Sequence, residues 1–221
     1  MLNAIIPVKS KSERVPNKNF RDFHNGNSLL DILLNKLKKI KDIDKVYVSS
    51  DKNLSNYCNE RGAIFLERNK DFCNNITPWS KVITEVVNSI PCKNNDTIMW
   101  CHVTGPLFNR YEEGIRIFKD SLKIGYDSLV AVEKLNEFIL NESFKPINYS
   151  WGEKHPYSQD LNPLYRVNGS LFIAQKKTML EHKYVLGKNA NILLCSEDDS
   201  IDIDTQSDFE KAKAKYNNLC S

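Results

Sequence analysis

Short apolar runs alternate with amphipathic stretches along the first half of the chain. The predicted strands lie at residues 2–8, 45–49, 63–66 and 97–102. The predicted helices, which carry apolar residues at i, i+3 and i+4, lie at residues 27–40, 53–62 and 78–90. Asn27 or Ser28 is suited to cap the first helix, and Gly62 to end the second. This alternation is typical of parallel βαβ units and predicts a doubly wound α/β sheet.

The second half continues this pattern around one irregular segment. A helix is predicted at residues 111–122, strands at 128–135, 164–174 and 191–195, and a C-terminal helix after an acidic turn. Residues 136–163 are rich in Asn, Pro, Tyr and Trp and show no sustained period. They are interpreted as a flap or an arm that reaches a partner subunit. We therefore expect one domain, residues 1–221, with an insertion at about 136–163.

Composition narrows the function classes. The net charge of +3 argues against bulk nucleic-acid binding, and no stretch approaches the ~20 apolar residues of a membrane helix. The first residues, MLNAIIPV, lack a basic leader. Six scattered cysteines form no CxxC pair, so neither a zinc site nor a disulfide framework is indicated. We expect a cytoplasmic protein with reduced thiols and neither nucleic acid nor membrane as a partner.

The loop after the first predicted strand concentrates positive charge. It reads IPVKSKSERVPNKNF and contains Lys9, Lys11, Arg14 and Lys18, one acid, Glu13, and no glycine. Loops at this point of α/β proteins often bind phosphate, usually through glycine-rich backbone. Two interpretations remain open: a phosphate site built from side-chain charge, or a solvated basic loop.

The stretch SIDID near the C-terminus places two carboxylates together. In an extended segment Asp202 and Asp204 share a face because side chains repeat every two residues. A divalent cation would relieve their repulsion, and hard oxygen ligands suit magnesium. The alternative is a helix cap, in which Asp204 or Thr205 precedes a helix beginning near Gln206.

Three further stretches lie at predicted strand ends. VSSD (residues 48–51) ends the second strand, and WCHVTGPLF (100–108) ends the fourth with a Gly-Pro turn. His102 either faces a cleft or forms structural hydrogen bonds. In YRVNGS, Asn168-Gly169 marks either a bulge within a strand or a hairpin turn.

Taken in order, these pieces resemble one family. IIPVKSKSERVPNKNF, VSSD, RGAIFLER, HVTGPLF, QDLNPLYRVNGSLFIA and SIDIDTQSDFE are similar to successive motifs of the acylneuraminate cytidylyltransferases, or CMP-sialic acid synthetases. These are related to the 3-deoxy-manno-octulosonate cytidylyltransferases. The resemblance runs from Ile5 to about Ala212. It implies a Rossmann-like three-layer nucleotidyltransferase fold, a mostly parallel mixed sheet, a small dimerisation insertion and a homodimer.

The resemblance also implies an activity. CTP would react with a sugar acid of the nonulosonic or octulosonic type to give a CMP derivative and pyrophosphate, as a step in surface polysaccharide biosynthesis. Mg²⁺ would be held by Asp202 and Asp204. The implied catalytic residues at the triphosphate are Lys18, Lys9 and Arg14. The implied CTP contacts are Asn19, Ser12, Arg68, Thr77 and Ser80, and the implied acceptor contacts are His102, Gln159, Asn168 and Gly169.

The chain departs from the family pattern at several of these positions. Where the family typically reads A-R-x-G-S-K, this chain has Lys9 in place of the arginine, Lys11 in place of the glycine and Glu13 in place of the lysine. Arg14 follows directly after Glu13. The family's Q-P-T-S-P is H-V-T-G-P here, and Tyr157-Ser158 stands where relatives often carry arginine. These changes leave two alternatives: a different anionic acceptor, such as a phosphonate or a phosphorylated acid, or a non-catalytic nucleotide-binding relative.

Overall fold

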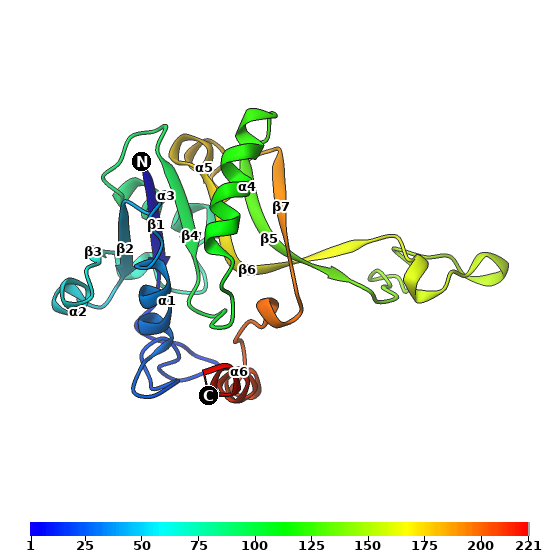
Figure 1. The fold of residues 1–221 in the computed structure, drawn as a ribbon, viewed down its shortest axis with the longest axis horizontal. Coiled ribbons are helices and arrows are strands. Elements are labelled where there is room, and N and C mark those ends of the chain that lie inside the picture. Colours follow the sequence, from blue (N-terminus) through cyan, green and yellow to red (C-terminus); the bar gives the residue numbers. More distant parts are fainter. Residues whose placement is uncertain (221) are drawn as a thin grey trace.

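A seven-stranded mixed sheet forms the centre of the molecule in the computed structural model, which describes residues 1–220, the side chain of residue 220 excepted (Figure 1). The strands are β1 (Leu2–Pro7), β2 (Lys45–Ser50), β3 (Ile64–Glu67), β4 (Thr97–Cys101), β5 (Ser128–Leu135), β6 (Leu164–Gln175) and β7 (Ala190–Cys195). Their order is β3-β2-β1-β4-β6-β5-β7. β6 pairs antiparallel with both β4 and β5, whereas the other pairs are parallel.

Helices cover both faces of this sheet. They are α1 (Leu29–Leu37), α2 (Ser55–Glu60), α3 (Trp79–Ser89), α4 (Tyr111–Lys123), α5 (Lys176–His182) and α6 (Gln206–Cys220). One buried cluster joins the sheet to α1, α2, α4 and α6, and a second joins it to α3 and α5. Side chains alternate along the buried β1, so that Ala4 and Ile6 enter the first cluster and Ile5 the second. The three-layer α/β fold with a mostly parallel mixed sheet is thus confirmed.

The predicted helix caps are found where the sequence indicated them. Ser28 caps α1, because its hydroxyl accepts from the Asp31 amide while the Asp31 carboxylate accepts from the Ser28 backbone. Gly62 adopts a positive φ of 65° just after α2. Helix α5 was not predicted, since its seven residues are too few for a clear apolar period.

The middle of β6 is irregular. In the pairing of β5 with β6, Val130 lies opposite Phe172 and Val132 lies opposite Val167. Two steps along β5 therefore correspond to five steps along β6. The extra residues form a bulge that contains Gly169, whose φ is 77°. Asn168-Gly169 therefore lies within a strand, and the alternative of a hairpin turn is wrong.

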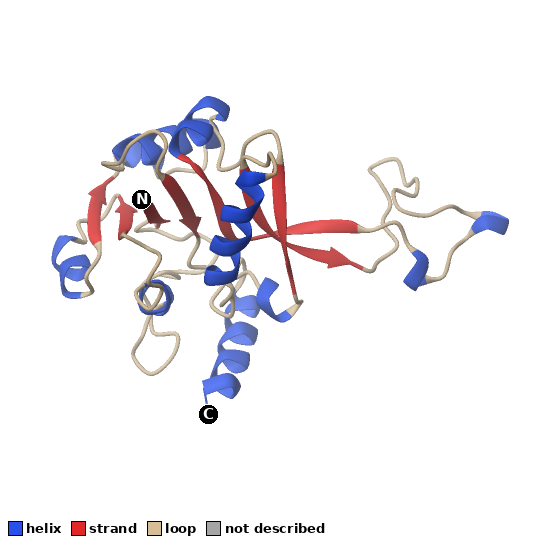
Figure 2. Ribbon diagram, turned by 45° about the horizontal axis from the view of Figure 1, so that its top comes forward, coloured by secondary structure: helices blue, strands red, loops and turns tan. Residues whose placement is uncertain are grey.

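Residues 136–163 leave the sheet as an arm. The ends of β5 and β6 continue as a two-stranded ribbon that carries the arm away from the body (Figure 2). Short 3₁₀ turns at Gly152–Lys154 and Ser158–Asp160 interrupt its irregular path. Among residues 1–220, no helix is long and apolar enough to span a membrane.

Candidate active site

A cleft of about 1120 Å³ opens at the carboxyl ends of the parallel strands. Its walls are the first loop after β1, a second loop that follows β3, and the end of β4. The predicted site residues that line it are Lys9, Ser12, Arg14, Lys18, Asn19, Arg68, Thr77 and His102. Because parallel strands end at one edge of a sheet, residues from distant parts of the chain meet here.

Hydrogen bonds to its backbone hold the first loop in place. The amide of Val8 donates to the Ser49 carbonyl at 2.9 Å, which continues the pairing of β1 with β2. Arg68, a buried residue just beyond β3, donates from Nη2 to the Val8 carbonyl at 2.7 Å. The side-chain amide of Asn19, also buried, donates to the Lys9 carbonyl at 3.1 Å. Two predicted nucleotide residues, Arg68 and Asn19, thus also shape the loop.

Three cations of the loop point toward different parts of the site. Lys9 Nζ crosses to the second loop, where it donates to the Asn74 carbonyl at 3.1 Å and to Asn75 Oδ1 at 2.8 Å. Arg14 Nη2 forms an ion pair with Asp204 Oδ1 at 2.7 Å. Lys18 Nζ donates to the backbone carbonyl of Ile203. Burial lowers the pKa of Lys18, and the carboxylates of Asp202 and Asp204 oppose that shift.

The two aspartates are held near these cations by the start of α6. Thr205 and Asp208 form a capping box: the Asp208 carboxylate accepts from the Thr205 amide and hydroxyl at 2.8 Å each, and the Asp208 amide donates to Thr205 Oγ1. Thr205 therefore caps the helix. Asp204 does not, so its carboxylate is directed to Arg14, and Asp202 remains solvent-exposed.

His102 is fully engaged in hydrogen bonds at the floor of the cleft. Its Nε2 accepts from Trp100 Nε1 at 2.8 Å, so the ring proton resides on Nδ1. The backbone of Gly169, in the β6 bulge, is the second partner of the imidazole. Burial lowers the pKa of His102. The geometry matches the structural alternative for this histidine, which links the end of β4 to the bulge.

Asn168 is buried beside this histidine contact. Its Oδ1 accepts from the Ser170 amide at 2.9 Å, whereas its Nδ2 is buried with no hydrogen-bond partner within the described residues. A buried donor without a partner costs free energy, so this side chain is a candidate for contact with a ligand.

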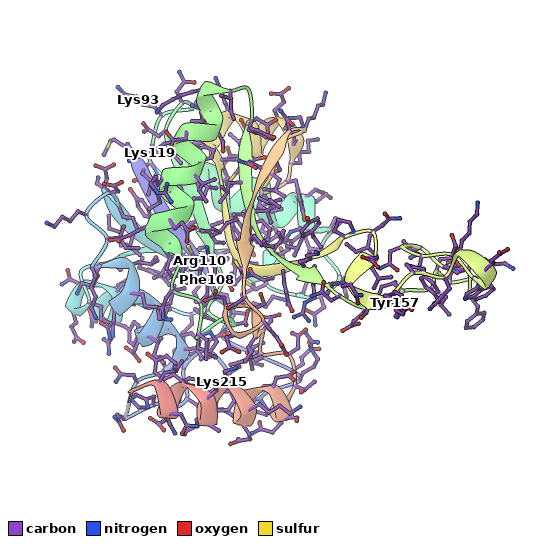
Figure 3. The ribbon with its side chains drawn as sticks, turned by 45° about the vertical axis from the view of Figure 1, so that its right-hand side comes forward. Lys93, Phe108, Arg110, Lys119, Tyr157 and Lys215 are labelled. Atoms are coloured by element: carbon purple, nitrogen blue, oxygen red, sulfur yellow. The ribbon has the colours of Figure 1, made fainter. Side chains whose placement is uncertain are left out.

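Six of the predicted site residues do not line the cleft within the described residues: Ser80, Gln159, Asn168, Gly169, Asp202 and Asp204. Ser80 is exposed in the first turn of α3 and lies outside the cleft lining among the described residues. Gln159 belongs to the arm, and Tyr157, two residues before it, lies on the arm between the body and the tip (Figure 3).

Several cleft residues were not predicted. Cys73, Asn74 and Asn75 line the second wall, next to Trp79, which lies inside the predicted stretch of residues 77–80. The only local signal for them was the polar, proline-containing stretch before α3, which does not distinguish a cleft wall from a surface loop.

An α/β sheet with a cationic loop after its first strand, facing a pair of carboxylates, has the organisation of a nucleotide-using transferase. Comparison with known proteins gives the family. The sequence model described as Cytidylyltransferase matches residues 3–218, and the chain belongs to this family of nucleotidyltransferases. The resemblance of its motifs is confirmed.

Individual relatives are more distant. The chain is 26% identical to pseudaminic acid cytidylyltransferase of Campylobacter jejuni subsp. jejuni serotype O:2, over 96% of this chain and 95% of that one. It is 29% identical to CMP-N,N'-diacetyllegionaminic acid synthase of Legionella pneumophila subsp. pneumophila, over 93% and 92%. Among solved structures, CMP:2-keto-3-deoxy-manno-octonic acid synthetase complexed with CTP matches with a TM-score of 0.66 at 10% identity, covering 99% of each chain. That likeness shows the shared fold.

Proposed function

We propose that the protein transfers the cytidylyl group of CTP to a sugar acid of the nonulosonic or octulosonic type, with release of pyrophosphate. The observation that carries this proposal is the meeting of Lys9, Arg14 and Lys18 at one cleft. Arg14 is paired with Asp204, and Lys18 lies within the electrostatic influence of both Asp202 and Asp204. The relatives named for pseudaminic and legionaminic acids support a nonulosonic acceptor.

In this proposal the reaction depends on charge and position rather than on a covalent nucleophile. Lys9 and Lys18 bind the triphosphate, and Lys18 stabilises the charge that develops on the departing pyrophosphate. Ser12, Asn19, Arg68 and Thr77 hold the nucleotide from the cleft walls, with Ser80 at the first turn of α3. The acceptor lies near His102 and the β6 bulge at Gly169, where the unpartnered Asn168 Nδ2 is the donor for one of its hydroxyl groups.

The residues present fit a magnesium ion held in part by substrate. No group of three or more His, Cys, Asp or Glu side chains among the described residues is placed to bind a metal. Asp202 and Asp204 offer two hard ligands beside the cationic loop, and Mg²⁺ commonly binds one or two carboxylates with phosphate oxygens and water. When bound, it would neutralise charge on the triphosphate.

We further propose a cytoplasmic homodimer that serves surface polysaccharide biosynthesis. Gln159 is exposed on the arm and is not part of the cleft lining among the described residues. The exposed side chains of the arm also include Phe144, Trp151 and Tyr157. Both features support an arm that reaches over the neighbouring subunit's site, where Gln159 would meet the acceptor.

The test is pyrophosphate release with CTP and Mg²⁺ over a panel of nonulosonic, octulosonic, phosphorylated and phosphonate acceptors. We expect turnover with a nonulosonic or octulosonic acid. Asp204→Asn should lose about 100-fold or more in rate while remaining folded, because several kcal/mol of metal-dependent stabilisation is lost. Unchanged turnover in Asp204→Asn would contradict the metal assignment. CTP uptake by calorimetry without pyrophosphate release from any acceptor would identify a non-catalytic binder.

A further inference from the structure

Asp51 is the last residue of the VSSD stretch, and its carboxylate holds the first loop by two bonds. Its Oδ1 accepts from the Ser10 amide at 2.8 Å, and its Oδ2 accepts from the Ser10 hydroxyl at 2.5 Å. Since β1 and β2 are parallel neighbours, residues just beyond their ends lie side by side. The bidentate contact fixes the loop one residue after Lys9, in a stretch that has no glycine with which to turn tightly.

The same carboxylate also contacts the opposite wall of the cleft. The Cys73 thiol is a further hydrogen-bond partner of Asp51. Cys73 Sγ also accepts from Arg68 Nε at 2.9 Å, and Arg68 in turn donates to the Val8 carbonyl. Asp51 therefore joins the first loop to the second loop, at Cys73. Asp51 does not itself line the cleft among the described residues.

The charge of Asp51 is suited to this position. Burial raises the pKa of Asp51, but the hydrogen bonds from the Ser10 hydroxyl and amide outweigh it, so the pKa is lowered overall. The carboxylate remains ionised and keeps accepting from both sides. The Ser10 amide already donates to Asp51, so a phosphate at this loop would be bound by the cationic side chains rather than by this amide.

We propose that Asp51 is the positioning residue of the nucleotide site: by holding Ser10 on one wall and Cys73 on the other, it sets the separation across which the triphosphate is bound. Its role toward CTP rests on the function proposed above. Its role toward the loop does not, because the loop is anchored whether or not a nucleotide is present.

Two measurements separate these roles. Trypsin cleavage after Lys11 and Arg14, both exposed in the first loop, reports how often the loop opens. Calorimetry with CTP in the absence of acceptor reports the nucleotide site. In Asp51→Ala we expect loop cleavage to accelerate and CTP affinity to fall, each about 10-fold or more, because hydrogen bonds to a charged group are lost. Asp51→Asn keeps one acceptor for the Ser10 amide and should give intermediate values, which tests the idea even if the alanine variant folds poorly.

Asp71→Ala is the matched control. Asp71 is an exposed aspartate two residues before Cys73, and its carboxylate accepts no hydrogen bond within the described residues. We expect neither measurement to change by more than about 2-fold.

Unchanged loop cleavage in both Asp51 variants would overturn the positioning role, whatever CTP does. Faster cleavage with unchanged CTP affinity would also overturn it, because the loop would then be anchored without consequence for the site. Faster cleavage in a protein whose wild type binds no CTP would support the anchoring by Asp51 and overturn the proposed function instead.

Discussion

At the scale of single residues, the candidate site balances its charges internally. Arg14 pairs with Asp204 at 2.7 Å, with 68% and 49% of the two side chains exposed. Lys18 lies within the electrostatic influence of both Asp202 and Asp204. Arg14 and Lys18 therefore lie beside the two carboxylates for which we propose a divalent metal ion as ligand. Arg14, which stands one residue after the family's lysine position, would compete with a metal ion proposed at Asp204.

Removing the charge of Arg14 should strengthen metal binding in the absence of nucleotide. Because exposed ion pairs contribute about 1 kcal/mol at most, we expect Arg14→Gln to raise Mn²⁺ affinity by no more than about 5-fold. Titration of free Mn²⁺ by electron paramagnetic resonance measures this directly. Arg116→Gln removes an exposed arginine from α4 and should leave the affinity unchanged. An affinity that stays constant or falls in Arg14→Gln would show that the pair does not compete with the metal.

At the scale of elements, one carboxylate joins α1 to α2. Asp31 completes the capping box of α1, and its Oδ1 also accepts from Tyr57 at 2.7 Å and from Arg61 Nε at 2.6 Å. Burial raises the pKa of Asp31, but the hydrogen bonds from Ser28, Tyr57 and Arg61 outweigh it and lower the pKa below its usual 3.8. The element that follows the cationic loop is thus anchored by an ionised group.

Asp31→Asn should cost about 2 kcal/mol of unfolding free energy at pH 7, because charge-assisted hydrogen bonds are lost from a largely buried group. Because the pKa of Asp31 is lower in the folded state than in the unfolded chain, its ionised carboxylate contributes fully to the free energy of unfolding above the usual pKa of 3.8. This contribution shrinks as the pH falls below that value. The difference in unfolding free energy between the wild type and Asp31→Asn should therefore become smaller from pH 4 to pH 2, as measured by urea unfolding at each pH. Asp42→Asn, at an exposed pair with Lys119, should cost less than about 0.5 kcal/mol. A difference that stays constant down to pH 2 would contradict the role of the Asp31 charge.

Elements were more predictable than contacts. The apolar runs placed β1 to β4 within about one residue, because a buried parallel strand needs a continuous apolar stretch. The Lys18-Asn19 end of the loop and the Asp202–Asp204 pair could be chosen as candidates from the sequence because they are local patterns. Arg14 and Asp204 are separated by 190 positions, and Ser10 and Asp51 by 41. Such pairings depend on strand order, which local periodicity does not specify.

At the scale of the whole molecule, the arm is a structured extension with internal contacts of its own. Asn148, only 1% exposed, accepts from the Ile139 amide at 3.0 Å and donates to the Glu137 carbonyl at 2.8 Å. Phe138 stacks on His155 with ring centroids 5.0 Å apart. Ordering these residues away from the body costs conformational entropy, and the exposed aromatic side chains of the arm offer apolar surface to a partner. A second copy of the chain is the partner that would place Gln159 at a cleft.

Mixing two inactive variants tests whether the arm acts across subunits. Asp204→Asn disables a cleft, and Gln159→Ala disables an arm. In a mixed dimer with exchanged arms, one site combines both defects, while the other combines an intact cleft with an intact arm. Random reassociation makes half of the dimers mixed, so about a quarter of wild-type activity should return, whereas arms that serve their own cleft would restore nothing. The readout is pyrophosphate release after joint dissociation and reassociation, with each variant treated alone as the control. If sedimentation shows that mixed dimers form but no activity returns, Gln159 does not act at the neighbouring subunit's site. The arm would then have a purely structural role.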